Sequence, residues 1–231
     1  MDIAEKTLQL KQDFDDVYEA GKEAQEKEFF DDFLYNADSA FSYRFAGAGW
    51  TAKTFQPKNK HMNVVGGSSM FFMSAIEVDL VEHLKSLNSS ISFSNLGVGI
   101  TQIFAYSNFI RLGELDFRTL NGLTSMFNSC KKLVTIDLLK IKTDGYQTFS
   151  TTFASCISLQ NIIIEGVIGQ NFDIKESPLT KESITSIVNA LSSTSSGKTV
   201  SFKKTAKENA FTDSEWSTLI ATKPNWTFSL V

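Results

Sequence analysis

LTSMFNSCKKLVTIDLLKI at residues 123–141 and FSTTFASCISLQNIIIEGV at residues 149–167 decide the fold of this chain. When the two stretches are aligned on Phe127 and Phe153, a cysteine follows three residues later in each. A leucine comes three residues after the cysteine, and a short run rich in isoleucine and leucine follows. Two segments that place the same chemistry at the same offsets predict a repeat protein.

A third copy of the pattern precedes these two, in ITQIFAYSNFIRLGELDF at residues 100–117. Its Phe104 lies 23 residues before Phe127, and Phe153 lies 26 residues after Phe127. These intervals fall in or near the range of about 20 to 29 residues that leucine-rich repeats use. A partial earlier copy begins at Met70. Five aligned columns agree in chemistry: Phe104, Phe127 and Phe153; Ser107, Cys130 and Cys156; Ile110, Leu133 and Leu159; Gly113, Ile136 and Ile162; Leu115, Leu138 and Ile164.

The repeat predicts how the coils pack. A single coil cannot bury its phenylalanine and its apolar run, so each coil needs a neighbour. Stacking would place strand beside strand and Phe104, Phe127 and Phe153 in one buried column. The serine and cysteine column would then line a tight turn. We interpret Cys130 and Cys156 as two buried thiols, with a disulfide between stacked coils as the alternative.

Residues 1–35 have the pattern of a long helix with a narrow apolar seam. At alternating steps of four and three residues, the seam contains Ile3, Thr7, Leu10, Phe14, Val17, Gly21 and Ala24. A seam this narrow is typical of coiled-coil pairing. We expect the segment either to associate with copies of itself or to lie along its own repeats.

The last segment, residues 177–231, has a different pattern from the repeats. Thr180 is expected to cap one helix, and a capping box from Thr212 to Glu215 opens another. Alternating apolar and polar residues from Trp226 onward predict a final strand. A helix–strand–helix–strand unit at the end of a stack would cover the apolar face of the last coil, so we expect a cap.

The predicted fold class is therefore α/β. We expect a short leucine-rich-repeat solenoid at residues 67–176, behind an amphipathic helix at residues 1–35 and a connector at residues 36–66. The α/β cap at residues 177–231 would close it.

Composition limits the classes of function. The chain has 231 residues and a formal net charge of −4, so it offers no positive field for nucleic acid or anionic lipid. Its apolar stretches are far shorter than the roughly 20 residues that span a bilayer. No signal-peptide pattern is seen at the N-terminus. A chain that starts at Met1 would be virion-associated, or cytoplasmic before assembly, and would reach the cell surface only if a signal had been trimmed.

No sequence pattern predicts catalysis or a cofactor. The motifs of phosphate-binding loops, zinc proteases and serine hydrolases do not occur in their proper contexts. His61 and His83 have no second histidine at metal-ligand spacing. We expect a protein that is not an enzyme and needs no metal or cofactor.

The candidate binding residues are strand positions that we expect to face outward: Glu114, Asp116, Asp137, Leu139, Ile163 and Glu165. Their carboxylates could hold a calcium ion or pair with a basic partner. They could equally form a solvated face with Arg118, Lys140 and Lys142 as counter-charges. Glu114 and Asp137 are the only pair suited to a glycan hydrolase, and stacked strands favour an open face over the cleft such an enzyme needs.

Residues 123–141 and 149–167 resemble BspA-type leucine-rich repeats, in which phenylalanine and cysteine or serine mark each coil. The whole order of segments is similar to that of uncharacterised repeat proteins of phages and prophages of gut bacteria. That order includes VYEAGKEA at residues 17–24, AGAGW at residues 46–50 and LTKESITSIVNALSS at residues 179–193. The resemblance implies a fold and a setting, because BspA-type proteins are thought of as surface adhesins and the phage relatives as tail or baseplate parts. It supplies no catalytic residues.

We therefore expect a non-enzymatic binding or structural protein that is associated with a phage or prophage tail. Its repeat surface would recognise a protein or a cell-surface glycan, and residues 1–35 would join copies of the chain. A BspA-like bacterial surface adhesin is the alternative, and a glycan-acting hydrolase is the third and weakest interpretation.

Overall fold

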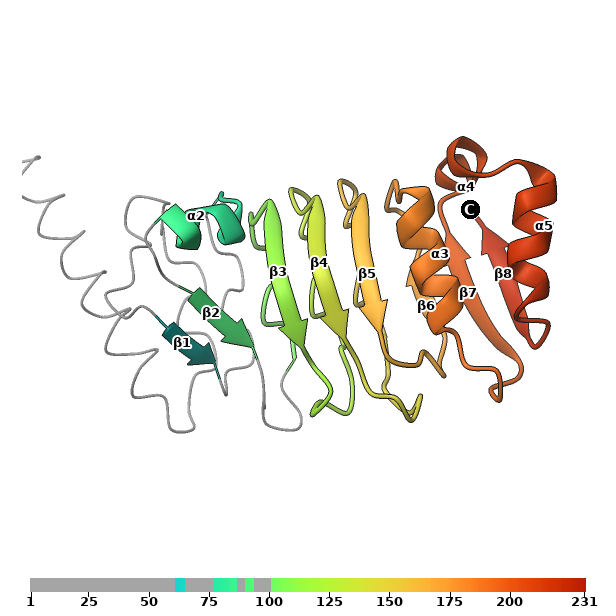
Figure 1. The fold of residues 1–231 in the computed structure, drawn as a ribbon, viewed down its shortest axis with the longest axis horizontal. Helices are drawn as coiled ribbons and strands as arrows, with labels where there is room; N and C mark the ends of the chain where they lie inside the picture. Colours follow the sequence, from blue (N-terminus) through green and yellow to red (C-terminus); the bar gives the residue numbers. More distant parts are fainter. Residues whose placement is uncertain (1–60, 65–76, 87–89, 94–100) are drawn as a thin grey trace, which may run out of the picture.

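The fold is mixed α/β, as the sequence predicts at this level, with helices and small parallel sheets following one another along one axis (Figure 1). The computed structural model describes residues 61–64, 77–86, 90–93 and 101–231. The predicted helix at residues 1–35 and the connector up to residue 60 lie outside the described residues, and so does the expected association through that helix. In the described part, no helix combines the length and the apolar character needed to cross a membrane.

All strand pairs among the described residues are parallel and form three sheets, in the orders β1-β2, β3-β4-β5 and β6-β7-β8. The strands are β1 (His61–Val64), β2 (Ser90–Phe93), β3 (Arg111–Asp116), β4 (Thr135–Lys140), β5 (Asn161–Glu165), β6 (Phe172–Ile174), β7 (Lys198–Phe202) and β8 (Trp226–Leu230). The helices are α2 (Leu80–Ser86), α3 (Lys181–Ala190), α4 (Lys204–Ala210) and α5 (Asp213–Ala221).

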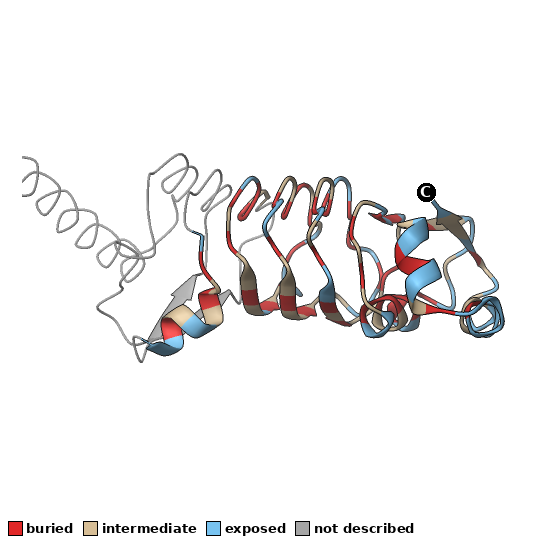
Figure 2. Ribbon diagram, turned by 90° about the horizontal axis from the view of Figure 1, so that it is seen from above, coloured by how far each residue is buried: buried red, intermediate tan, exposed pale blue. Residues whose placement is uncertain are grey.

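Three successive coils form the middle of the molecule, and each is hydrogen-bonded to the next on two sides. On one side β3, β4 and β5 pair in parallel, with Arg111 opposite Thr135 and Thr135 opposite Asn161. On the other side the turns bond to one another, as where the N–H of Phe127 donates to the carbonyl of Thr152. Viewed from above, strands lie along one edge, turns along the other, and buried residues recur in every coil (Figure 2).

The three repeat phenylalanines form the predicted buried column. The ring centroids of Phe104 and Phe127 are 5.6 Å apart with the planes 7° from parallel, and those of Phe127 and Phe153 are 5.3 Å apart at 14°. All three side chains are buried. Phe172 of β6 extends the column, with its ring 5.6 Å from that of Phe153. A continuous column of aromatic rings therefore runs through the core of the central stack.

The two cysteines are free and buried, as predicted. The Sγ of Cys130 donates to the carbonyl of Phe104 at 2.9 Å, and the Sγ of Cys156 donates to the carbonyl of Phe127 at 3.0 Å. Each thiol therefore ties its turn to the coil before it. Burial raises the pKa of Cys130 to about 12 and that of Cys156 well above its ordinary value, so both remain protonated at neutral pH.

Every turn in the stack contains two residues with left-handed backbone, four positions apart, and none of them is glycine. These residues are Gln102, Tyr106, Ser125, Ser129, Thr151 and Ser155, with φ between 51° and 60°. Such a conformation is unfavourable for a residue that carries a Cβ and persists only where surrounding contacts hold it. Bonds to the next coil hold Ser125 and Ser129, whose N–H groups donate to the carbonyls of Ser150 and Ala154.

Two predicted columns are shifted by one residue in the first coil. Phe109 and Leu112 are the buried residues there, whereas Ile110 and Gly113 are only partly buried. Leu112 lies opposite Ile136 of β4. The physical reason is that the first coil has one residue fewer between its turn and its strand than the later two coils.

The prediction that Leu139 faces outward is wrong, because its side chain is fully buried. Ile136 pairs with Ile162, but the register then shifts so that Leu139 pairs with Ile164. β4 thus has two residues between its buried positions where β5 has one, which is the geometry of a β-bulge. Because of the extra residue, the side chain of Leu138 is partly exposed and that of Leu139 is buried in the core.

α3 covers the edge of the three-stranded sheet that β5 would otherwise leave open. The N–H groups of Ile162 and Ile164 donate to the hydroxyls of Ser183 and Ser186, each at 2.9 Å. On the turn side, the N–H of Ser155 donates to the carboxylate of Glu176 at 3.0 Å, in the position where earlier turns use a carbonyl of the next coil. Side chains replace backbone partners at the end of the stack.

The C-terminal unit has both predicted helix caps. Thr180 caps α3, and Thr212 with Glu215 forms the capping box of α5. The unit also contains β6 and α4, which the sequence did not predict, so its order from residue 172 is strand, helix, strand, helix, helix, strand. Phe172 and Phe202 of its sheet are buried in the same core as the repeats.

Candidate binding face

The outward-facing side chains of β3, β4 and β5 form one surface, which we call the sheet face. It faces the viewer in Figure 1, with α2 on the side of β3 and α3 on the side of β5. α2 leans over β3, because a Cβ on Gly113 would lie 3.3 Å from the side chain of Val81. α3 is fixed along β5 by its two serine hydroxyls. A helix therefore borders the sheet face beside its first strand, β3, and beside its last strand, β5.

Arg111 and Asp137 form a bidentate ion pair between neighbouring strands of the sheet face. The guanidinium donates from Nε and Nη2 to the two carboxylate oxygens, at 2.8 and 3.0 Å. Asp79 and Glu82 lie within 3.7 and 4.0 Å of the same guanidinium. The hydrogen bond to Asp137 is the main reason that the pKa of Arg111 is raised. One cation thus links β3, β4 and the segment that leads into α2.

A second group of charges lies at the carboxyl ends of the strands. Glu114 accepts from the ammonium of Lys140 at 2.5 Å, which raises the pKa of that lysine. Asp116 accepts two hydrogen bonds from the guanidinium of Arg118, at 2.9 and 2.6 Å, and these lower the pKa of Asp116. Glu165 lies near enough to both cations to interact with them electrostatically.

The structure therefore places five of the six predicted binding residues on the sheet face and moves Leu139 into the core. Three of the four carboxylates are held by cations of the chain. In the described residues no group of three or more histidine, cysteine, aspartate or glutamate side chains is arranged to hold a metal ion. The alternative of a face neutralised by its own counter-charges fits this arrangement best, with Arg111 as an additional cation that the sequence did not single out.

The centre of the sheet face is apolar. Leu138 and Ile163 are both partly buried, and Leu138 takes the outward position because of the bulge in β4. An alignment of β4 with β5 does not predict that Leu138 faces outward. The reason is that β4 has two residues between its buried positions, whereas β5 has one. Ion pairs around a small apolar centre are typical of a surface that another molecule can cover.

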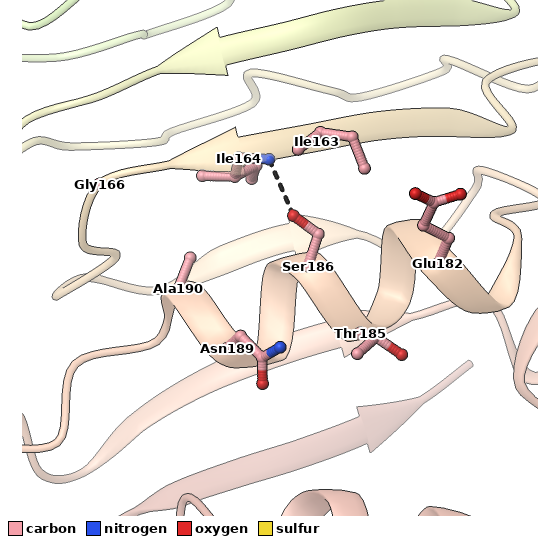
Figure 3. A pocket seen from close by; sticks show the side chains of 8 residues that line it. All are labelled: Ile163, Ile164, Gly166, Glu182, Thr185, Ser186, Asn189 and Ala190. Atoms are coloured by element: carbon pink, nitrogen blue, oxygen red, sulfur yellow. Dashed lines mark hydrogen bonds between the residues drawn. The ribbon is translucent and has the colours of Figure 1, made fainter.

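A groove of about 450 Å³ opens between β5 and α3, at one end of the sheet face (Figure 3). Its sheet side contains Ile163, Ile164 and Gly166, and its helix side contains Glu182, Thr185, Ser186, Asn189 and Ala190. The hydrogen bond from the N–H of Ile164 to the hydroxyl of Ser186 fixes the distance between the two sides. The sequence pointed to Ile163 only, because the helix side is brought there by the tertiary fold.

The two carboxylates considered for a hydrolase lie on neighbouring strands but do not act as a pair. Glu114 is bound to Lys140, and Asp137 is bound to Arg111. A glycoside hydrolase needs one carboxyl to give up a proton and the other to act as base or nucleophile across a bound sugar. Two carboxylates that are each held by a separate cation on an open face provide no such arrangement.

The chain matches no protein-family model, and searches for similar curated proteins and similar solved structures find no match.

Proposed function

We propose that this protein is a non-enzymatic binding or structural protein, built as a short leucine-rich-repeat solenoid that presents its sheet face to a partner. The observation that carries the proposal is the stack of three equivalent coils, closed by side chains at its last edge. Stacked coils with a common phenylalanine column and a common serine or cysteine position are expected of a repeat protein.

The end of the stack supports the solenoid interpretation. A repeat array exposes an apolar face and an unpaired strand edge at its terminus, and such edges attract other chains. Ser183 and Ser186 bind the edge N–H groups of β5, and Glu176 binds the last turn. We interpret residues 172–231 as the cap, which adds β6 to the predicted range of 177–231.

The setting that we propose is a phage or prophage tail, on the resemblance of the repeats and flanking segments to such proteins. A bacterial surface adhesin of the BspA type would present the same sheet face, so the fold is compatible with both. Genes for tail components and holins beside the coding sequence would support the tail, whereas genes for sortase or secretion would support the adhesin.

Binding of the labelled full-length chain to a glycan array and to a panel of gut bacteria tests the proposal. We expect saturable binding to one class of target, weakened at least tenfold by Leu138→Ser on the sheet face. Ile157→Ser is the matched control, because Ile157 is 51% exposed but lies on the turn side of the stack. Equal effects of both variants, or turnover of a bound glycan, would contradict the proposal.

A further inference from the structure

The two walls of the groove, β5 and α3, are hydrogen-bonded to each other. α3 is held against the strand by two hydrogen bonds of 2.9 Å, from Ile162 to Ser183 and from Ile164 to Ser186. Its first turn is capped by Thr180, whose side chain accepts from the N–H of Ser183. A ligand in the groove would meet preformed walls, so little ordering of this part of the chain would be needed for binding.

The groove combines aliphatic surface with one carboxylate, that of Glu182. Ile163, Ile164 and Ala190 provide aliphatic surface. Glu182 lies at one end of the groove, next to the side chain of Ile163 in the view of Figure 3, and Asn189 lies toward the other end. None of the eight residues that line the groove is basic.

The carboxylate of Glu182 at this groove differs from those on the rest of the sheet face. Asp137, Glu114 and Asp116 are each held by a cation. Glu182 forms no ion pair within 4.0 Å among the residues that the structure describes. The nearest lysine along the helix, Lys181, is bound to Glu215. The carboxylate of Glu182 is therefore not held by a cation of the described residues.

We propose that this groove binds a lysine or arginine side chain from an extended segment of a protein partner. The aliphatic stem would lie on Ile163, and the charged head would pair with Glu182, in the way that long basic side chains bury their methylenes and keep the head group at a polar rim. A groove of about 450 Å³ also has room for the residues beside that side chain. The inference rests on the proposed function, since it names the class of partner that one end of the sheet face recognises.

The test uses the ¹⁵N-labelled full-length chain and two peptides, acetyl-Ser-Val-Lys-Val-Ser-amide and the same peptide with norleucine in place of lysine. We expect the lysine peptide to shift the amide resonances of Ile163, Gly166 and Asn189 and to bind at least tenfold more tightly than the norleucine peptide. Equal affinity of the two peptides, or shifts confined to another part of the chain, would overturn the proposal. This comparison needs no variant, so it stands even if a substitution unfolds the protein.

Glu182→Gln should reduce binding of the lysine peptide to the level of the norleucine peptide, with an unchanged melting temperature. Glu208→Gln on α4 is the matched control, because Glu208 is also an exposed helical glutamate, 3.9 Å from Lys204, and we expect it to have no effect. An equal loss in both variants would mean that only the net charge matters, and it would contradict a site in the groove. Stronger shifts of the same amides by an N-acetylglucosamine tetramer would also overturn the proposal in favour of a glycan.

The outcomes separate the groove from the broader function. If the labelled chain binds cells or glycans but neither peptide, the groove proposal fails and the proposed function stands. If the lysine peptide binds in the groove while no cell, glycan or partner binds the sheet face in the Leu138 experiment, the groove site stands and the broader function fails.

Discussion

The N–H of Ile162 donates to the hydroxyl of Ser183 across 2.9 Å, so a side chain of α3 stands where the next strand of the stack would place a carbonyl. Ser183 also donates its own proton to the carbonyl of Gln160. One buried serine thus bonds to two backbone groups, one in β5 and one in the residue before it. The edge of the sheet is closed by a helix that lies beside it without adding a strand.

Removing this hydroxyl should destabilise the end of the stack. Ser183→Ala leaves the buried N–H of Ile162 without its partner, and we expect a loss of about 1–3 kcal/mol in the free energy of unfolding. Ser214→Ala on α5 is the control, since Ser214 is exposed, and its effect should be within about 0.5 kcal/mol. Urea denaturation of the three proteins measures both values. A Ser183→Ala protein as stable as the control would show that the edge does not depend on this bond.

Phe127 lies in the middle of the aromatic column, with Phe104 above it and Phe153 below it in the stack. Phe127→Ala should cost about 3–5 kcal/mol, because neighbouring coils on both sides prevent collapse around the cavity. Tyr146→Ala, at a position that is 77% exposed, should change stability by less than about 0.5 kcal/mol. Chemical denaturation gives the comparison, and a loss below about 1 kcal/mol for Phe127→Ala would disprove the column.

The bulge in β4 makes two adjacent leucines unequal. Leu139→Ala should cost about 2–5 kcal/mol because the side chain is fully buried. Leu138→Ala should cost less than about 1 kcal/mol, since that side chain is only partly buried on the sheet face. The two variants control for each other, and melting curves are sufficient. A larger loss of stability for Leu138→Ala than for Leu139→Ala would instead support the register that the sequence suggested.

The buried thiol of Cys130 should make stability depend on alkaline pH. Its pKa is raised to about 12 in the folded protein from about 9 in the unfolded chain, mainly by burial. The folded state therefore keeps its proton while the unfolded state loses it, so this contribution is complete below pH 9 and is lost as the pH rises toward 12. Over that interval the free energy of unfolding should fall by about 1.4 kcal/mol per pH unit for this one group.

Other groups titrate in the same range, so the measurement is the difference between the wild type and Cys130→Ser. We expect the pH dependence from 9 to 11 to be shallower in the variant, because serine does not ionise there. In the native protein, a thiol reagent at pH 8 should modify neither cysteine without denaturant. Rapid labelling, or identical pH slopes for the two proteins, would argue against a buried neutral thiol.

The seam of residues 1–35 lies outside the described residues, and its association remains a prediction. Light scattering on the full chain and on a version that starts near Phe29 decides the outcome. An oligomer that becomes a stable monomer on truncation would support assembly through the helix. A full-length monomer that loses stability on truncation would mean that the seam packs on its own fold.

By itself, the sequence determined the period of the coils, the phenylalanine and thiol columns and the two helix caps. These features depend on contacts between equivalent positions of neighbouring coils or on residues within one helical turn, so a recurring side chain or a capping motif is enough to predict them. Thr180 and the Thr212–Glu215 box are of this local kind.

Only the tertiary structure decided which residues face outward and what closes the stack. The shorter first coil and the bulge in β4 each move the pattern by one residue, and a one-residue change in a strand exchanges buried and exposed faces, as it does for Leu138 and Leu139. The left-handed turn residues are not glycines, and bonds to the next coil hold Tyr106, Ser125 and Ser129 in this conformation. The groove with Glu182 exists only because α3 lies beside β5, where the next strand of the stack would otherwise pair.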